Sequence, residues 1–196
     1  EEFYQPLEGK PVEEIPDDDS FKIIFTGNIG NAQGLQVLPQ TAELLKNENV
    51  KFFIVGDGRY LEELEQEIKQ RNVQNQFVMI PRQPARRIPE LLAVCDAAFL
   101  SFRNDELWTK TIPAKLQSYM ACGMPIIAAA HGETARIIEE ANCGVCCPVG
   151  DAEKLSIRIR EMRELNLDII KENSRKYFCD NFDKKKLMNQ MECYFR

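Results

Sequence analysis

The sequence predicts an α/β fold, in which a doubly wound parallel sheet of about six strands carries helices on both faces and a helical tail follows. Two observations lead to this prediction. Short, almost continuously apolar runs alternate along the chain with amphipathic segments, a pattern typical of parallel strands that are buried on both faces. Glycine and proline residues separate many of these segments, as expected where the chain turns.

Each element is predicted from its own run of residues. The expected strands are Phe21 to Thr26, Lys51 to Val55, Gln76 to Ile80, Ala97 to Ser101, Pro125 to Ala129 and Val145 to Cys147. The expected helices between and after them are Ala32 to Lys46, Arg59 to Gln70, Ile88 to Cys95, Pro113 to Cys122, Glu133 to Ala141 and Ala152 to Leu165. This order makes a Rossmann-like sheet, whose ligands bind beyond the carboxyl ends of the strands.

The chain divides into three parts. Residues 1–20, rich in proline and acidic groups, are expected to form a linker or the edge of the domain, which then covers residues 21–165. Residues 166–196 contain no further strand. Two helices are expected there, at Asp168 to Cys179 and Asp183 to Tyr194, and their apolar residues require a surface on which to dock.

The composition excludes several classes of protein. The 31 acidic and 25 basic residues give a net charge of −6, and the basic residues are not gathered in a stripe, so a nucleic-acid partner is not expected. No apolar run reaches the roughly 18 residues of a membrane span, and the acidic first twenty residues contradict a signal peptide. We therefore expect a cytoplasmic location.

Seven cysteines, an odd number without a paired framework, indicate reduced thiols rather than disulfides. The segment Cys143-Gly-Val-Cys146 matches the C-x-x-C pattern and leaves open a redox or zinc site. It follows an expected helix instead of opening one, however, which favours small buried hydrophobic side chains.

The helix expected at 113–122 is the most informative segment. Thr111 can accept a hydrogen bond from a first-turn N–H, Pro113 suits an early helical position, and Gly123 with Pro125 ends the helix. Lys115 lies one turn in. An open helix N-terminus beside an ammonium group is a site for a phosphate or diphosphate, although an ordinary capped helix explains the same residues.

Other turns follow the expected strands. The first strand leads into a loop with Gly27, Gly30 and Gly34, which either brings the backbone close to a ligand or forms only a turn. Its spacing matches neither a dinucleotide fingerprint nor a P-loop. The second strand ends in a turn with Gly56 and Gly58.

Several side chains in the remaining loops have a possible role in ligand binding and an alternative structural role. Asp57 is expected to cap the following helix, and Pro81 with Arg82 either meets a planar base or lies in solvent. His131 is the only histidine, but no nucleophile in a recognisable turn accompanies it. Phe102 and Trp108 either stack on a ligand or pack their loop. Together these loops predict one crevice at the carboxyl edge of the sheet.

The motifs, taken in order, resemble the C-terminal, nucleotide-sugar-binding domain of GT-B glycosyltransferases of family 4. They are the Gly27 loop, Val55-Gly-Asp-Gly58, Ala93 to Asp96, Tyr119-Met-Ala-Cys-Gly-Met-Pro125 and Cys143-Gly-Val with Pro148 to Asp151. The likeness covers about residues 21–165. Gly27-Asn-Ile-Gly30, Ala32-Gln-Gly34 and Ile112-Pro-Ala-Lys115 look most like bacterial members that add amino sugars or deoxysugars to O-antigen or capsule.

The resemblance implies a role for each site residue. The segment of Thr111, Ile112 and Pro113 would hold the diphosphate of a donor such as a UDP-sugar, with Lys115 as its cation. Pro81 and Arg82 would meet the base, Ser118 the ribose, and the turns at Gly27, Gly34, Gly56 and Gly58 would line the donor site. The family commonly carries Arg and Lys on the first loop. Asn28 and Gln33 stand there in this chain, as neutral side chains that would donate hydrogen bonds.

The family's paired glutamates fall at Lys110 and Ser118. Lys110 therefore joins Lys115 as a candidate to stabilise the leaving diphosphate. The resemblance also implies retention of the anomeric configuration, no metal or other cofactor, and a glycan or lipid-linked acceptor bound by a separate N-terminal domain. The helical tail resembles the terminal helix that crosses back to that domain.

The resemblance thus implies the donor-binding half of a hexosyltransferase, inactive as this fragment alone. Such a protein would work in the cytoplasm, and the whole enzyme could associate peripherally with the inner face of the plasma membrane. Two alternatives stay open at this point. One is a free-standing module that binds nucleotides or phosphorylated sugars, and the other is a degenerate interaction domain.

Overall fold

The computed structural model describes residues 3–103, 111–184, 186 and 188. It contains one six-stranded sheet with the order β3-β2-β1-β4-β5-β6, in which all neighbouring strands are parallel. The strands are β1 (Phe21–Asn28), β2 (Val50–Asp57), β3 (Phe77–Ile80), β4 (Ala97–Ser101), β5 (Ile126–Ala129) and β6 (Gly144–Cys147). The predicted doubly wound α/β class is confirmed.

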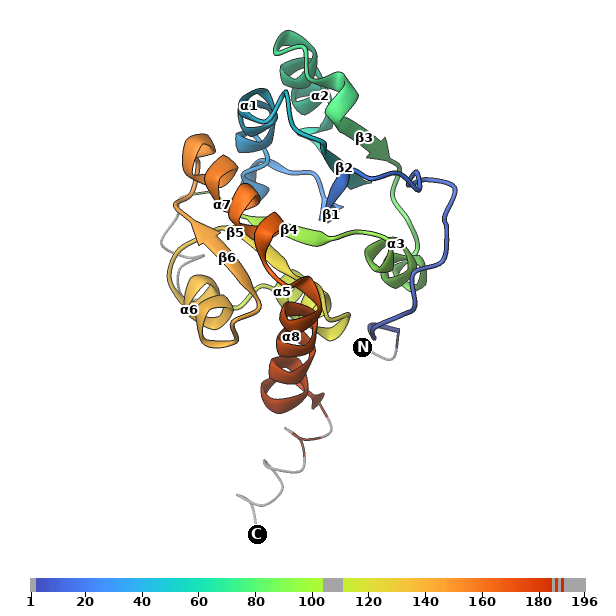
Figure 1. Ribbon diagram of the computed structural model, residues 1–196, viewed down its shortest axis with the longest axis vertical. Helices are drawn as coiled ribbons and strands as arrows, with labels where there is room; N and C mark the ends of the chain where they lie inside the picture. The colour runs from blue at the N-terminus through green and yellow to red at the C-terminus, as the bar shows by residue number, and fades with distance from the viewer. Residues whose placement is uncertain (1–2, 104–110, 185, 187, 189–196) are drawn as a thin grey trace.

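Helices cover both faces of this sheet (Figure 1). Residues of α1 (Val37–Leu44), α2 (Leu61–Gln70) and α7 (Ala152–Glu164) belong to the core on one face. Residues of α3 (Ile88–Ala93), α5 (Ala114–Ala121), α6 (Glu133–Glu140) and α8 (Leu167–Asn181) belong to or pack against the core on the other. Side chains of the strands alternate between the two cores, as a period of two requires: Ile23 and Phe25 face the first, whereas Ile24 faces the second.

One expected helix is shorter than predicted. The prediction placed it over Ala32 to Lys46, but a short 3₁₀ turn, η1 (Asn31–Gln33), comes first and α1 begins only at Val37. The break lies at Gly34, which has φ of +64° and buried surroundings. A continuous helix cannot contain this left-handed residue.

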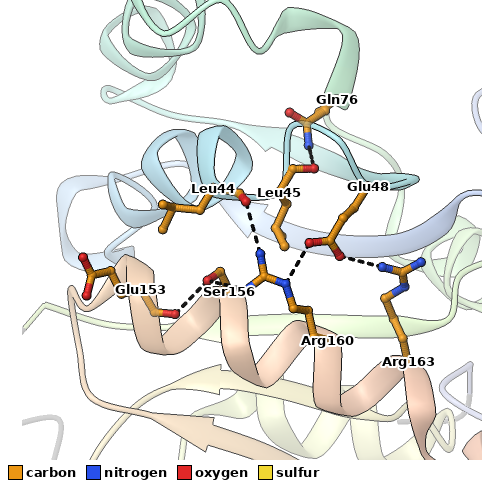
Figure 2. Close-up of polar contacts among 8 residues, drawn as sticks. All are labelled: Leu44, Leu45, Glu48, Gln76, Glu153, Ser156, Arg160 and Arg163. Carbon is orange, nitrogen blue, oxygen red and sulfur yellow. Dashed lines mark hydrogen bonds and ion pairs between the residues drawn. The ribbon is translucent and has the colours of Figure 1, made fainter.

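Polar contacts hold α1 to α7 (Figure 2). The carboxylate of Glu48 accepts hydrogen bonds from Arg160 Nε and Arg163 Nη1, each at 2.7 Å. Arg160 Nη2 also donates to the Leu44 carbonyl at the end of α1, at 3.2 Å. These contacts lie away from the carboxyl edge of the sheet and support the first core.

The first 20 residues, expected as a linker, lie against the domain. Figure 1 shows this segment running past α3 on one side of the molecule. Ile15 is only 3% exposed and belongs to the second core. Glu14 forms an ion pair with Arg87 of η3 (Ala85–Arg87) at 2.8 Å. The segment therefore contacts the domain at a few residues, among them Tyr4, Val12 and Ile15, while most of its other residues are exposed.

The first helix of the C-terminal tail docks on its own domain. In α8, the Ser174 hydroxyl donates to the Met124 carbonyl at 2.8 Å and Arg175 Nη1 donates to the Ala121 carbonyl at 2.6 Å. Both carbonyls lie at the C-terminal end of α5, so α8 covers that end. The second expected helix, Asp183 to Tyr194, falls mostly outside the described residues.

Candidate functional site

The site lies where the strand order reverses. β1 stands between β2 and β4: the chain runs from β1 to β2 and β3 on one side, and then crosses back past β1 to β4, β5 and β6 on the other. Such a switch point opens a crevice at the carboxyl ends of the strands. Gly27 and Asn28 end β1 there and are both exposed.

The turns after β1 and β2 are locked together. Gly27 is in register with Gly56, and Asn28 with Asp57. A Cβ atom on Gly56 would lie 1.9 Å from the Gly27 carbonyl oxygen, and one on Gly58 would lie 2.2 Å from the Ile29 carbonyl oxygen. Only glycine permits this close backbone approach, which keeps the rim of the crevice flat beside Gly27.

Asp57 does not have the predicted capping role. Its Oδ1 accepts a hydrogen bond from the Gly58 N–H at 2.7 Å, while the cap position of α2 is Tyr60 and carries no side-chain cap bond. The Asp57 carboxylate thus stabilises the turn at the next residue, Gly58, and not the first turn of α2. The prediction failed because the chain makes an additional turn over Gly58 to Tyr60 before α2 begins at Leu61.

α5 begins at Ala114, later than the expected start at Pro113. Pro113 occupies the cap position with extended backbone, and no side chain caps the helix there. The cap position thus falls on Pro113, two residues after Thr111, where the prediction had placed it. Ala114 is exposed, so the described residues leave the amino end of α5 open. The predicted helix end at Gly123, which has φ of +69°, is confirmed.

The amino end of α5 faces the Gly27 rim. Lys115 Cε and Nζ lie 3.3 and 3.4 Å from the position that a Cβ on Gly27 would take. Lower in the same helix, the Tyr119 hydroxyl accepts a hydrogen bond from the Thr26 N–H at 2.9 Å. Tyr119 is fully buried, and this bond ties α5 to the end of β1. The sequence reasoning used Tyr119 only as part of a motif and missed this contact.

The Lys115 ammonium is enclosed without a carboxylate partner among the described residues that contact it. It donates a hydrogen bond to Gln33 Oε1 at 2.7 Å and lies 3.7 Å from the centre of the Phe25 ring. Burial lowers the pKa of this ammonium to about 7, because the charged form loses its hydration. Gln33 was expected to donate hydrogen bonds to a ligand, but its oxygen accepts one from Lys115.

A pocket of about 460 Å³ opens at the carboxyl ends of β2 and β3. It brings together three predicted donor-binding residues, Gly56, Pro81 and Arg82. Sequence reasoning did not select the apolar side chains that line it further, which include Ile29, Leu61 and Met79. A pocket of this size with mainly apolar walls can hold a planar heterocycle.

Three further predicted residues lie around α5. Ile112 is exposed just before the helix. Ser118 lies one turn into it, where its hydroxyl donates to the Ala114 carbonyl at 3.1 Å. The described contacts do not join Ser118 to the Gly27 rim. Lys110 and Trp108 lie outside the described residues.

The other candidates behave as structural residues. Phe102 is 5% exposed and packs in the second core. His131 accepts a weak hydrogen bond from the Val149 N–H at 3.4 Å. Burial raises the pKa of both Cys143 and Cys146 to about 12, which argues against a reactive C-x-x-C pair.

Three structural findings concern ligands and membranes. Six cysteines in the described part of the chain are free thiols. Within the described ranges, no group of three or more His, Cys, Asp or Glu side chains is placed to hold a metal ion. None of the helices described is both long and apolar enough to cross a membrane.

The chain is similar in sequence to a known protein family and to curated proteins. Residues 9–185 match the model of the family "Glycosyl transferases group 1". The chain is 30% identical over 173 residues to the probable glycosyltransferase WbjE of Pseudomonas aeruginosa, covering 85% of this chain and 42% of that protein. It is also 30% identical over 182 residues to the putative colanic acid biosynthesis glycosyl transferase WcaI of Escherichia coli, covering 90% and 43%.

A solved structure shares the fold. Anabaena Alr3699/HepE, crystallised in complex with UDP, superposes with a TM-score of 0.79 at 21% identity, over 90% of this chain and 49% of that one. The chain thus spans less than half the length of the curated relatives it matches. By its sequence match and its fold, the chain belongs to the glycosyl transferases of group 1, as a C-terminal GT-B domain.

Proposed function

We propose that this chain is the donor-binding half of a retaining hexosyltransferase that takes its sugar from a UDP-sugar during assembly of a cell-surface polysaccharide. The observation that carries the proposal is the meeting of the open amino end of α5 and the Lys115 ammonium with the Gly27 rim. Backbone N–H groups, a helix dipole and an ammonium group then converge where a diphosphate would lie.

The pocket beside Gly56 would hold the nucleotide base. Pro81 and Arg82 line it at the end of β3, and the apolar walls formed by Ile29 and Leu61 suit the faces of a uracil ring. The crystal structure of HepE with UDP supports this choice of nucleotide. The Ser118 hydroxyl would need to turn from the Ala114 carbonyl to donate to a ribose oxygen.

The reaction would depend on how well the leaving group is stabilised. The bond between the anomeric carbon and the β-phosphate oxygen breaks, and the acceptor oxygen forms the new glycosidic bond on the same face. The acceptor's proton passes to the departing diphosphate. Negative charge grows on that diphosphate, and fixed N–H groups with Lys115 would stabilise it without a metal ion. Lys110 is proposed as a second cation.

The rest of the protein would supply the acceptor site. The relatives are more than twice as long as the matched part, so we propose that a further domain binds a glycan or lipid-linked acceptor and that this fragment alone transfers nothing. The description of WcaI as a colanic acid enzyme supports a role in surface polysaccharide assembly. We also propose that the whole enzyme works in the cytoplasm, where peripheral contact with the inner face of the plasma membrane would bring it to a lipid-linked acceptor.

Calorimetric titration of the chain with UDP, UDP-GlcNAc, GDP, ADP and uridine tests the proposal. We expect UDP compounds to bind best, and Lys115→Gln to weaken UDP binding about 30-fold with little effect on uridine. Equal losses for UDP and uridine would refute the role of Lys115. If no nucleotide releases heat, an interaction domain replaces the enzyme proposal, and binding of free phosphates alone would favour a stand-alone binding module.

A further inference from the structure

Two residues that are far apart in the chain meet at the rim. Gln33 ends η1, Lys115 is the second residue of α5, and 82 positions separate them. The ammonium group has only hydrogen-bond donors, so the side-chain atom that faces it at 2.7 Å must be the amide oxygen of Gln33. The amide NH₂ of Gln33 is left to point elsewhere.

The backbone of Gln33 is held on several sides. Its carbonyl accepts a hydrogen bond from the Ser101 hydroxyl, and its N–H donates to the Gly30 carbonyl at 2.9 Å. The next residue, Gly34, has φ of +64°, and a Cβ on it would lie 2.8 Å from the Phe102 carbonyl oxygen. The loop is therefore anchored to the end of β4 and presents the Gln33 side chain from a fixed base.

The chemistry of the two contacts leaves the charge of Lys115 uncompensated. An amide oxygen and the face of an aromatic ring both attract an ammonium group without carrying a formal charge. A carboxylate at position 33 would attract it more strongly but would neutralise it. The elements packed against the ammonium present Phe25 and Gly27 from β1 and Gln33 from η1, none of which titrates.

We infer that Gln33 is a positioning residue, which holds the Lys115 ammonium beside Gly27 while leaving its positive charge available to a diphosphate. This inference rests on the proposed function. It assigns to the first loop the task of holding a cation that α5 supplies. If the position of the charge is what matters, Gln33 and Lys115 form an exchangeable pair: a lysine at position 33 and a glutamine at position 115 would place the ammonium group in the same region.

Substitutions at position 33 test the role of the neutral oxygen. Gln33→Glu keeps the size and adds a charge at hydrogen-bond distance from Lys115, so we expect UDP affinity to fall about 10-fold or more. Gln33→Leu removes the acceptor without adding charge, and we expect a smaller loss, about 3-fold to 10-fold. Uridine affinity should stay the same in both. Gln40→Glu, at an exposed position of α1, is the matched control for net charge.

The pH profile separates positioning from a merely structural role. In the native chain, UDP affinity should decline as the pH rises through about 7, because the free protein then loses the Lys115 proton. In Gln33→Glu the carboxylate holds that proton, and the decline should move to higher pH. An unchanged profile in Gln33→Glu would overturn the inference.

An exchange of the pair is the sharpest test. Lys115→Gln alone should bind UDP weakly, and the double variant Gln33→Lys with Lys115→Gln should regain at least about 10-fold. If the double variant has the same unfolding temperature as the native chain but does not regain UDP affinity, the two residues are not an exchangeable pair. If the native chain does not bind UDP at all, the proposed function fails. If it binds and only the exchange fails, the exchangeable pair is wrong, and the positioning role is decided by the position-33 variants and the pH profile.

Discussion

Each end of β1 has a lysine beside it, and the two lysines have opposite kinds of partner; Lys22 is buried and Lys115 is partly buried. Near the amino end, Lys22 is 8% exposed, and its ammonium lies 3.6 Å from the Asp18 carboxylate and donates to the Asp18 carbonyl. At the carboxyl end, Lys115 contacts a neutral amide and an aromatic ring. The fold thus neutralises the cation at the amino end and leaves uncompensated the cation that we propose binds a diphosphate.

The backbone differs in the same sense. At the carboxyl end, Gly27 and Gly56 bring their backbones into close contact. At the amino end, carboxylates hold the chain instead: the Lys22 N–H donates to Asp96 Oδ2 at 2.7 Å, and Lys51 forms an ion pair with Asp18 at 2.5 Å. Side-chain ion pairs stabilise the amino end, and bare backbone shapes the carboxyl end. The glycines therefore leave main-chain atoms without covering side chains at the carboxyl end.

Among the substitutions that test this difference between the two ends, Gly56→Ala should cause the largest loss of stability. Its Cβ would lie 1.9 Å from the Gly27 carbonyl oxygen, so the two turns must separate. We expect a loss of at least about 3 kcal/mol in the free energy of unfolding, measured by urea denaturation. Gly150→Ala is the control, because no atom lies within 4 Å of its added Cβ, although its φ of +76° carries a backbone cost of its own. Equal losses in both variants would show that the close approach to Gly27 adds nothing.

Lys22→Met should destabilise the protein by about 1–2 kcal/mol, because it removes the partner of Asp18 and the hydrogen bond to its carbonyl. UDP binding should be unaffected, since Lys22 lies at the opposite edge of the sheet. The measurement is thermal unfolding together with UDP titration. A loss of UDP affinity here would break the division between the two ends.

Lys115→Met should have the opposite sign and stabilise the protein by about 1 kcal/mol at pH 6, because it removes a buried, uncompensated charge. The folded protein holds the Lys115 proton only below pH about 7, whereas the unfolded chain holds it to about 10.4. Native stability at this site therefore rises with pH across that window, and the advantage of Lys115→Met should shrink between pH 6 and pH 9. A constant difference would contradict the buried charge.

Lys51→Ala should have the smallest effect, below about 1 kcal/mol, because its pair with Asp18 is partly exposed to solvent. Hydrogen bonds from Lys51 and Ser20 lower the pKa of Asp18. Its contribution to stability is thus present at neutral pH and is lost as the pH falls through the lowered pKa. Urea denaturation at pH 7 and pH 3 should show most of the Lys51→Ala difference still present at pH 3, because that pH lies above the lowered pKa of Asp18. A difference that vanishes by pH 3 would contradict the lowered pKa.

Much of the candidate site could be predicted because it depends on local signals. The glycines at 27, 34, 56 and 58 occur where a strand ends, and those turns do converge at the carboxyl edge. The predictions for Thr111 and Asp57 both concerned the residue at a helix N-cap. The structure places these caps at Pro113 and Tyr60, because each helix begins one or two residues later than predicted. Single-residue shifts of that kind depend on packing that a local pattern does not contain.

The sequence by itself determined which segments become strands or helices and at which edge the glycine turns gather, because these follow from repeats over neighbouring residues. Only the tertiary structure decided that Lys115 faces Gln33 and Phe25, that Tyr119 bonds to β1, and that α8 covers the end of α5. These contacts require the strand order, with β4 beside β1 rather than beside β3. That order results from how whole faces pack against one another, and the pattern of any single segment does not specify it.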